Sequence, residues 1–203
     1  YKAGYMMNFS IKVDKQEQGG QYKLTLVGKS ISEWESDLVS HNATAKEYLV
    51  VNSTPGKLKE AITALGKDYT KVKNLKITGE INAEDFFFMR DYMSRLSGLN
   101  LKEVRIKASC EPYQGEEWYD DQIPGSAFYS GKGDGNESLN RIILPDRLKA
   151  IGGNAFYDCR YLTGSLVIPE GVTEIRRGAF NGCIGLNGTL SLPSTLKKLG
   201  NNW

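Results

Sequence analysis

The chain has 203 residues, 40% of them hydrophobic, and a mean hydropathy of −0.41, so it can bury a substantial core and is not expected to be disordered. Its 26 basic and 24 acidic residues give a net charge of only +2, which offers no electrostatic indication of a nucleic-acid partner. No apolar run reaches the roughly 18 residues that a membrane helix needs. No signal peptide precedes Tyr1, so we expect a soluble piece of a longer protein.

Residues 1–42 are predicted to form a β-hairpin segment. Hydrophobic residues alternate along Asn8–Val13 and along Tyr22–Val27, and the stretch Gln18–Gln21 joins the two runs as a turn. A lone hairpin is marginally stable in water, so this one should pack against another part of the protein. We therefore separate it from a second domain at 43–203.

Residues 43–110 are predicted to be the N-terminal cap and irregular first units of that domain. A strand at Tyr48–Val51 precedes a helix that starts near Thr54 and ends at Gly66. The residues expected to face inward from this helix are Leu58, Ala61, Ile62 and Leu65.

A second helix is predicted after Asn82, whose side chain is suited to an N-cap, and it is expected to end at Gly98. Its inward face would consist of Phe86, Met89, Met93 and Leu96. The strand motifs Leu75–Ile77 and Val104–Ile106 lie 29 residues apart and are interpreted as equivalent strands of successive units.

The segment Cys110–Gln122 is interpreted as an insert between the irregular units and the regular repeats. It places Tyr113, Trp118 and Tyr119 among four acidic residues. Aromatic residues on a long loop are candidates for stacking on a sugar ring or anchoring a protein interface. The alternative is a structural lid, in which Trp118 covers the side of the core.

Residues 123–203 repeat with a period of 24, except that a longer loop at Lys132–Ser138 sets the first copy 28 residues before the second. Two full copies agree at an Ala-Phe pair, at a cysteine and at a Leu-x-[Ile/Leu]-Pro strand, and a third copy at Ile123–Gly131 has glycine in place of the cysteine. Such a period is typical of stacked units that share one continuous core. Each unit is expected to have the strand, a turn and an apolar Ile-x-x-x-Ala-Phe segment, with Phe128, Phe156 and Phe180 in a core ladder.

The strand positions that alternate with core positions are predicted to form an exposed sheet face, which is a common binding surface in stacked repeats. The basic residues on this face are the main candidates for ligand binding. The alternative is that they are ordinary solvent-exposed side chains with no binding role. Together with the insert they give these candidate ligand-binding residues: Lys76, Arg105, Lys107, Arg141, Tyr113, Trp118 and Tyr119.

Catalytic, metal and cofactor motifs are not apparent. His41 is the only histidine and has no nucleophile motif beside it, and there is neither a GxGxxG nor a Walker loop. The stretch Gly133–Asn136 has only two side chains at calcium-ligand spacing. Cys159 and Cys183 share one repeat position, where parallel side chains favour two buried thiols over a disulfide. We expect no enzyme, metal or cofactor.

The repeat pattern from Ile123 to Leu199 resembles the BspA-like leucine-rich repeat family of bacterial surface proteins. The resemblance implies an α/β solenoid, a right-handed superhelix with helical N-terminal units. Trp203 departs from it, because the period calls for alanine there. Residues 1–37, with "KAGY" at Lys2–Tyr5, resemble the end of a fimbrillin-like domain from Bacteroidales. Together these resemblances imply an exported envelope protein with a lipid anchor outside this chain.

The function predicted from these observations is non-enzymatic recognition or adhesion at the cell surface. The partner would be a protein or glycan on a host or neighbouring cell, bound through the sheet face and the insert, with no nucleic acid involved. A structural alternative is a spacer or tip component of a fimbria-like assembly. An enzyme acting on envelope glycans is a third, weaker reading, because no convergent acid–base pair is evident.

Overall fold

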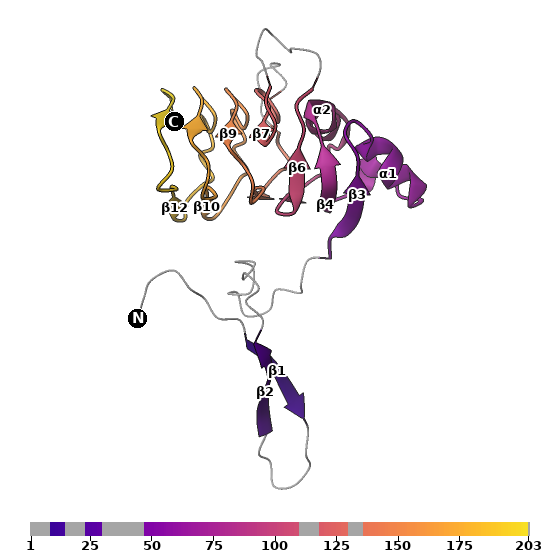
Figure 1. The fold of residues 1–203 in the computed structure, drawn as a ribbon. Helices are drawn as coiled ribbons and strands as arrows, with labels where there is room; N and C mark the ends of the chain where they lie inside the picture. The colour runs from indigo at the N-terminus through magenta and orange to yellow at the C-terminus, as the bar shows by residue number, and fades with distance from the viewer. Residues whose placement is uncertain (1–8, 15–22, 30–46, 110–117, 130–135, 203) are drawn as a thin grey trace. The chain divides into compact units, whose positions relative to one another are not determined.

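The computed structural model describes residues 9–14, 23–29, 47–109, 118–129 and 136–202 (Figure 1). The chain divides into two compact units, Tyr1–Lys46 and Glu47–Trp203. In the first unit, β1 (Phe9–Asp14) pairs antiparallel with β2 (Lys23–Lys29), with an irregularity in the pairing between Phe9 and Ile11. The predicted pairing of these two runs is confirmed, whereas the predicted turn at Gln18–Gln21 lies outside the described residues.

The second unit is a stack of rungs, and its elements follow one another in short steps. In chain order they are β3 (Leu49–Ser53), α1 (Leu58–Ala64), the 3₁₀ helix η1 (Tyr69–Lys71), β4 (Asn74–Ile81), α2 (Ala83–Tyr92), β5 (Gly98–Asn100), β6 (Val104–Ile106), β7 (Gln122–Ile123), β8 (Arg141–Ile143), β9 (Ala150–Ile151), β10 (Leu166–Val167), β11 (Glu174–Ile175), β12 (Leu190–Ser191) and β13 (Lys198–Leu199).

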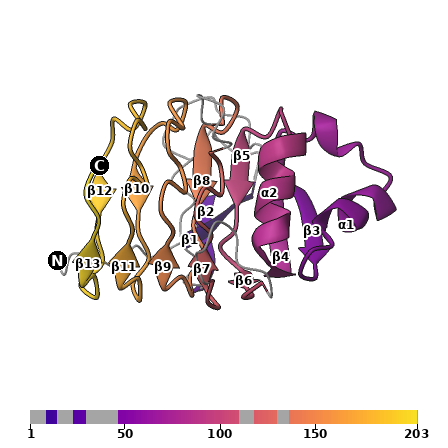
Figure 2. The same cartoon turned by 90° about the horizontal axis from the view of Figure 1, so that it is seen from above.

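The strands of this unit lie in two parallel rows, which Figure 2 shows side by side. Row one contains β3, the first half of β4, β5 and β8, followed by the pair β10 and β12. Row two contains the second half of β4 with β6, followed by β7, β9, β11 and β13. The long strand β4 therefore spans both rows, whereas each later strand is short and belongs to one row.

The structure corrects the assignment of equivalent strands in the early units. Leu75 aligns with Leu99 on β5, 24 residues later, so the period of the regular repeats already holds here. Val104–Ile106 instead aligns with Gly79–Ile81 in row two. The expected equivalence of Leu75–Ile77 with Val104–Ile106 was wrong because the second row of strands was not foreseen.

The insert connects two successive strands of row two, because β7 follows β6 without a row-one strand between them. The two strands are joined through the Asp121 amide, which donates to the Ile106 carbonyl at 2.7 Å. The chain therefore passes row two twice in succession, and the insert lies between the two passes in sequence.

Both early helices are shorter than the sequence predicted. Helix α1 begins at Leu58, not at Thr54, and Leu65 is 52% exposed rather than inward. Helix α2 begins after Asn82, whose side chain accepts from the Glu84 amide in a full capping box. It ends at Tyr92, and Gly98 starts strand β5 because the chain must re-enter row one there.

The core is a column of aromatic rings and aliphatic side chains between the rows and the third side of each rung. Phe128 stacks on Phe156 with ring centroids 5.3 Å apart, and Phe156 stacks on Phe180 at 5.1 Å. The predicted ladder is confirmed, and Phe86 of α2 extends it by an edge contact with Phe128 at 6.0 Å. The helix and the Ala-Phe turns thus occupy the same side of successive rungs.

The last rung is less covered than its predecessors. Leu166 on β10 is 5% exposed, whereas its equivalent Leu190 on β12 is 48% exposed; likewise Ile175 is 1% and Leu199 is 50% exposed. Each rung buries the one before it, so the final described rung keeps an apolar side. Among the described helices, none has the length and apolar character to cross a membrane.

Candidate functional site

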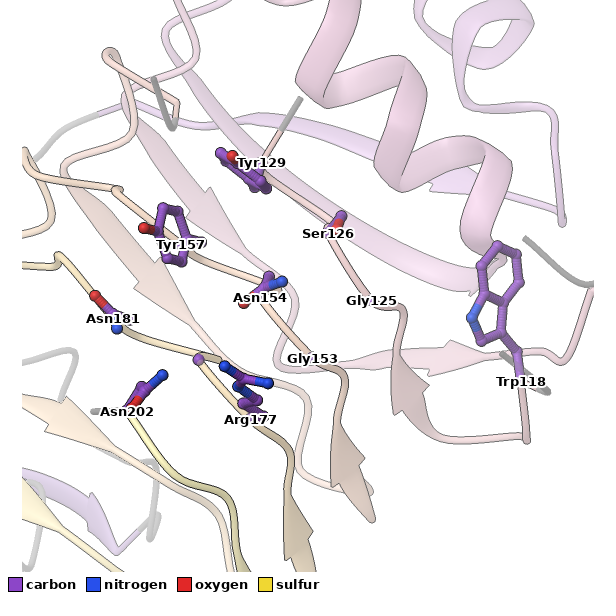
Figure 3. Close-up of a pocket in the computed structure, with 11 residues that line it drawn as sticks. Trp118, Gly125, Ser126, Tyr129, Gly153, Asn154, Tyr157, Arg177, Asn181 and Asn202 are labelled. Atoms are coloured by element: carbon purple, nitrogen blue, oxygen red, sulfur yellow. The ribbon is translucent and has the colours of Figure 1, made fainter. Parts of the chain in front are cut away.

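A groove of about 510 Å³ runs across successive Ala-Phe turns on the third side of the rungs (Figure 3). We call it the rung groove. Its lining residues are Trp118, Gly125, Ser126, Tyr129, Gly153, Asn154, Tyr157, Arg177, Gly178, Asn181 and Asn202. Ten of the eleven come from three repeat positions, so the stacking itself brings them into line.

One repeat position gives the groove its shape, because its backbone is left-handed in four successive rungs. The φ angles are 54° at Ser126, 52° at Asn154, 66° at Gly178 and 64° at Asn202. Asparagine and glycine tolerate this conformation better than most residues. A Cβ on Gly178 would overlap the Asn154 side-chain oxygen, so this glycine leaves room for the asparagine before it.

The backbone amides of the turns form hydrogen bonds between successive rungs. The amides of Ser126, Asn154 and Gly178 each donate to a carbonyl of the next rung, at 2.9, 3.0 and 3.0 Å. The amides of Phe128 and Phe156 do the same at 2.8 Å. The groove floor is therefore a parallel ladder, and mainly side chains are left to contact a partner.

Aromatic rings form one wall of the groove. Tyr129 and Tyr157 lie on successive rungs with ring centroids 4.7 Å apart and an interplanar angle of 54°. Trp118 lies at the far end, where its ring contacts Phe87 of α2 at 5.7 Å. Arg90 of α2 donates to the Ser126 carbonyl at 3.0 Å, which fixes the first turn of the groove to the helix.

The groove has one formal charge. Among the described residues that line it there is no carboxylate, imidazole or thiol, and Arg177 is the single basic side chain. Its neighbour Arg176 faces Glu174 at 3.7 Å, but Arg177 makes no ion pair within the described part of the chain. The site therefore offers amide and hydroxyl groups, aromatic faces and one guanidinium group, and no acid–base pair.

The two cysteines of the repeats are free thiols that serve the core rather than the groove. The Cys183 thiol donates to the Phe156 carbonyl at 3.0 Å, and the Cys159 thiol lies 3.9 Å from the Phe128 carbonyl. Burial raises the pKa of each thiol to about 12. Both therefore stay protonated donors between neighbouring rungs at neutral pH.

The basic residues predicted on the sheet face lie on two different rows, and two of them have acidic partners. Lys76 pairs with Glu103 at 2.7 Å in row one, and Lys107 at the end of row two pairs with Asp120 at 2.5 Å. These lysines lower the pKa of each carboxyl, with the Ala108 amide also lowering that of Asp120. Arg105 is exposed and aligns with Glu80.

The remaining predicted residues are spread over the molecule. Arg141 is half-buried at the start of β8, and Tyr119 is 57% exposed beside row two. Tyr113 lies outside the described residues, as do His41 and most of the Gly133–Asn136 stretch. Of the predicted candidates that the structure describes, only Trp118 lines the rung groove.

No cluster of three or more metal-binding side chains occurs in the described ranges. Asn136 acts as a turn cap, since its side-chain oxygen accepts from the Ser138 amide, the Ser138 hydroxyl and the Leu139 amide at 2.8–3.0 Å. The buried carboxylate of Asp85 accepts from the amides of Gly56, Leu58 and Asn82, and so caps both early helices. Burial raises the pKa of Asp85 despite these donors.

The groove was not among the sites predicted from the sequence, although a signal for it was present. Tyr129 and Tyr157 directly follow the Ala-Phe pair, and Asn181 occupies the same place in the next unit. The residue before each Ala-Phe pair is serine, asparagine or glycine, which are the types that turns favour. A comparison of these equivalent positions between successive repeats predicts that they form one aligned surface.

Residues 121–203 match the family described as "BspA type Leucine rich repeat region (6 copies)". A solved structure, "Crystal structure of T. pallidum Leucine Rich Repeat protein", is 20% identical with a TM-score of 0.33; the match covers 62% of this chain and 60% of that chain. The chain thus matches about three fifths of that protein's length. No curated protein matches it. Leucine-rich repeat proteins are typically non-enzymatic and commonly mediate protein–protein interaction or adhesion, and those of the BspA type are typically surface-associated.

Proposed function

We propose that the BspA-type repeat region, with the rungs before it, is a non-enzymatic recognition module that holds an extended partner in the rung groove. One observation carries this proposal: four successive rungs place equivalent residues in a single groove of about 510 Å³. A partner lying along the stack would meet polar or aromatic groups from every rung. Affinity would then come from several modest contacts on a rigid surface, as preorganised binding sites achieve.

The module is proposed to act at the outer face of a bacterial cell, on a protein or glycan of a host or neighbouring cell. The family match at 121–203 supports surface association. A lipid anchor outside this chain, a Bacteroidales source and a fimbrillin-like N-terminal segment remain part of the proposal. The right-handed superhelix is likewise proposed from the resemblance.

A second contact surface is proposed on the outer sheet face and the end of the insert. Its members are Lys76, Arg105, Lys107, Arg141, Tyr113 and Tyr119. The pairing of Lys76 with Glu103 and of Lys107 with Asp120 lowers the charge available for an acidic partner. We therefore rank this surface below the groove.

A binding screen of the full chain tests the proposed function. The chain is immobilised and exposed to purified extracellular-matrix proteins and to an array of defined oligosaccharides. The groove variant Tyr157→Ala and the sheet-face variant Lys76→Glu, Arg105→Glu, Lys107→Glu are measured in parallel. Binding weakened by the groove variant supports the proposal; binding weakened only by the sheet-face variant moves the site to that face. Absence of any binding in both panels contradicts a recognition role.

A structural role is the second candidate, and the β1–β2 pair favours it. The pair is the only sheet described in Tyr1–Lys46, and an isolated two-stranded sheet is marginally stable. Strand exchange with another subunit would stabilise it. Concentration-dependent assembly of the full chain, abolished by Ile11→Pro in β1, would support this role; a monomer at all concentrations would exclude it for this chain.

A further inference from the structure

We infer that the partner of the rung groove is a linear oligosaccharide that contains acidic sugar residues. This inference rests on the proposed function and specifies its ligand. It follows from the types of side chain that line the groove, from the use of its backbone groups, and from the position of its one charge.

The lining is suited to sugars because it combines aromatic faces with planar polar groups. The C–H faces of pyranose rings pack on aromatic rings. Tyr129 and Tyr157 supply such rings along one wall, and Trp118 supplies one at the far end of the groove. The amides of Asn154, Asn181 and Asn202 each offer two donors and an acceptor, which match the hydroxyl groups at the ring edge. Stacked rungs repeat at about 4.8 Å, close to the length of one pyranose residue.

A peptide partner is disfavoured by the same lining. Peptide grooves bind by strand addition or by apolar anchors. The described lining residues include no aliphatic side chain, and the amides of Ser126, Asn154 and Gly178 already donate to neighbouring rungs. An added peptide strand would therefore find few backbone partners, and a leucine or valine anchor would find no apolar pocket.

A nucleic acid is disfavoured by charge. Binding along a phosphate backbone uses several lysine or arginine side chains, whereas Arg177 is the single basic side chain among the described lining residues. The whole chain has a net charge of only +2. One guanidinium among neutral amides fits an occasional carboxylate or sulfate on a sugar chain better than a regular row of phosphates.

Arg177 gives the groove its preference for acidic sugars. It belongs to the third of the four rungs and makes no ion pair within the described ranges. No carboxylate is among the described residues that line the groove. The planar guanidinium group can bind a uronate carboxylate through two parallel hydrogen bonds.

The inference is tested by titrating the full chain with defined oligosaccharides in a calorimeter. The probes are a hyaluronan octasaccharide and a galacturonate octasaccharide as acidic chains, and maltooctaose and cellohexaose as neutral chains. We expect at least one acidic probe to bind more tightly than both neutral ones, and its affinity to fall between 50 mM and 500 mM NaCl because salt screens the Arg177 contact.

Three groove variants and two matched controls locate the contact. Arg177→Gln should raise the Kd for the acidic probe about tenfold or more, since a hydrogen bond to a charged group is lost. Asn181→Asp should weaken acidic probes while sparing neutral ones, and Tyr157→Ala should weaken both about two- to tenfold. The controls Arg147→Gln and Tyr161→Ala remove an exposed arginine and an exposed tyrosine outside the groove and should change nothing.

Each outcome decides the matter. Loss of binding in the groove variants, with melting temperatures like the wild type and intact controls, supports the inference. Binding of an acidic probe that Arg177→Gln and Asn181→Asp leave unchanged overturns it. If no oligosaccharide binds but a matrix protein does, and Tyr157→Ala weakens that binding, the recognition role stands and the carbohydrate inference fails.

Discussion

Replacing Phe156 by alanine tests the view that the phenylalanine column holds the rungs together. Phe156 is fully buried and lies between two rings, 5.3 Å from Phe128 and 5.1 Å from Phe180. Removing a buried phenylalanine side chain costs about 3–5 kcal/mol of unfolding free energy, and the loss of two ring contacts places this variant toward the upper end. The turns on either side are fixed by backbone ladders, so the cavity cannot close easily.

We therefore expect a loss of about 4–5 kcal/mol, in the upper part of that range. A domain of this size is typically stable by only 5–15 kcal/mol, so the variant should keep little stability. The loss should also be local, because stacked rungs contact mainly their neighbours. Hydrogen exchange should accelerate in β10–β13 while the amides of β4 and α2 stay protected.

Urea denaturation followed by circular dichroism measures the total loss, and hydrogen exchange with mass spectrometry locates it. Phe88→Ala is the matched control: Phe88 is half-buried and contacts Tyr69 and Tyr92 outside the column, so we expect about 1–2 kcal/mol. A loss below about 1.5 kcal/mol for Phe156→Ala, or exchange that rises uniformly over the rungs, would refute the reasoning.

Three further predictions follow from buried and paired groups. Asp85→Asn should lower the free energy of unfolding by about 1–3 kcal/mol, because one amide oxygen cannot accept from the amides of Gly56, Leu58 and Asn82 together. A change below about 0.5 kcal/mol in urea denaturation would contradict the capping of both helices by Asp85. Burial raises the pKa of Cys159 from 9.0 to about 12, so the unfolded chain releases this proton first and stability should fall as pH rises from 9 to 12. That fall should be shallower in Cys159→Ala, and equal slopes would argue against a protonated core thiol. The pKa of Asp120 is lowered by Lys107 and the Ala108 amide, so the stabilisation it gives is present above pH 3.8 and is lost as pH falls through the lowered value. The protection factor of the Ala108 amide, which corrects for the intrinsic pH dependence of exchange, should therefore fall toward pH 2 in the wild type, and in Asp120→Asn it should be low at every pH.

The regular part of the fold was predictable because the same residue types recur at regular intervals in the sequence. The strand prolines recur every 24 residues and the Ala-Phe pairs after 28 and then 24 residues, and the buried positions followed from them. Row two was missed because its strands are two or three residues long, too short for an alternation of polar and apolar residues to be visible. The row-two part of the early rungs is the second half of β4, which the sequence pattern shows only as part of one continuous strand.

A further copy of the repeat, at Ile81–Phe86, was not recognised in the sequence because of Asp85. Ile81 and Phe86 match Ile123 and Phe128 in spacing and burial, but Asp85 stands where the later units have alanine. A carboxylate at a core position argues against a match when only residue types are compared. The structure explains the exception, because three backbone amides surround this carboxylate and replace the water that it loses.

The groove could not be predicted from any local motif. Its side chains are 24 or 28 residues apart and differ in type, since Tyr129, Tyr157 and Asn181 share one position. What unites them is the left-handed turn beside them, a property of the backbone that serine, asparagine and glycine all permit. A site built by stacking therefore becomes visible only when the stacking is known.

The hydrogen bonds between the turns have a consequence for any molecule that lies in the groove. The amides of Ser126, Asn154 and Gly178 each donate to a carbonyl of the next rung, so the groove keeps its shape only while these junctions are closed. A ligand that contacts several rungs binds the closed junctions and not the opened ones, and it therefore stabilises the stack against local unfolding. A substitution that opens one junction would weaken binding in proportion to the loss of the closed state. The stability of the junctions and the affinity for a ligand are therefore thermodynamically coupled.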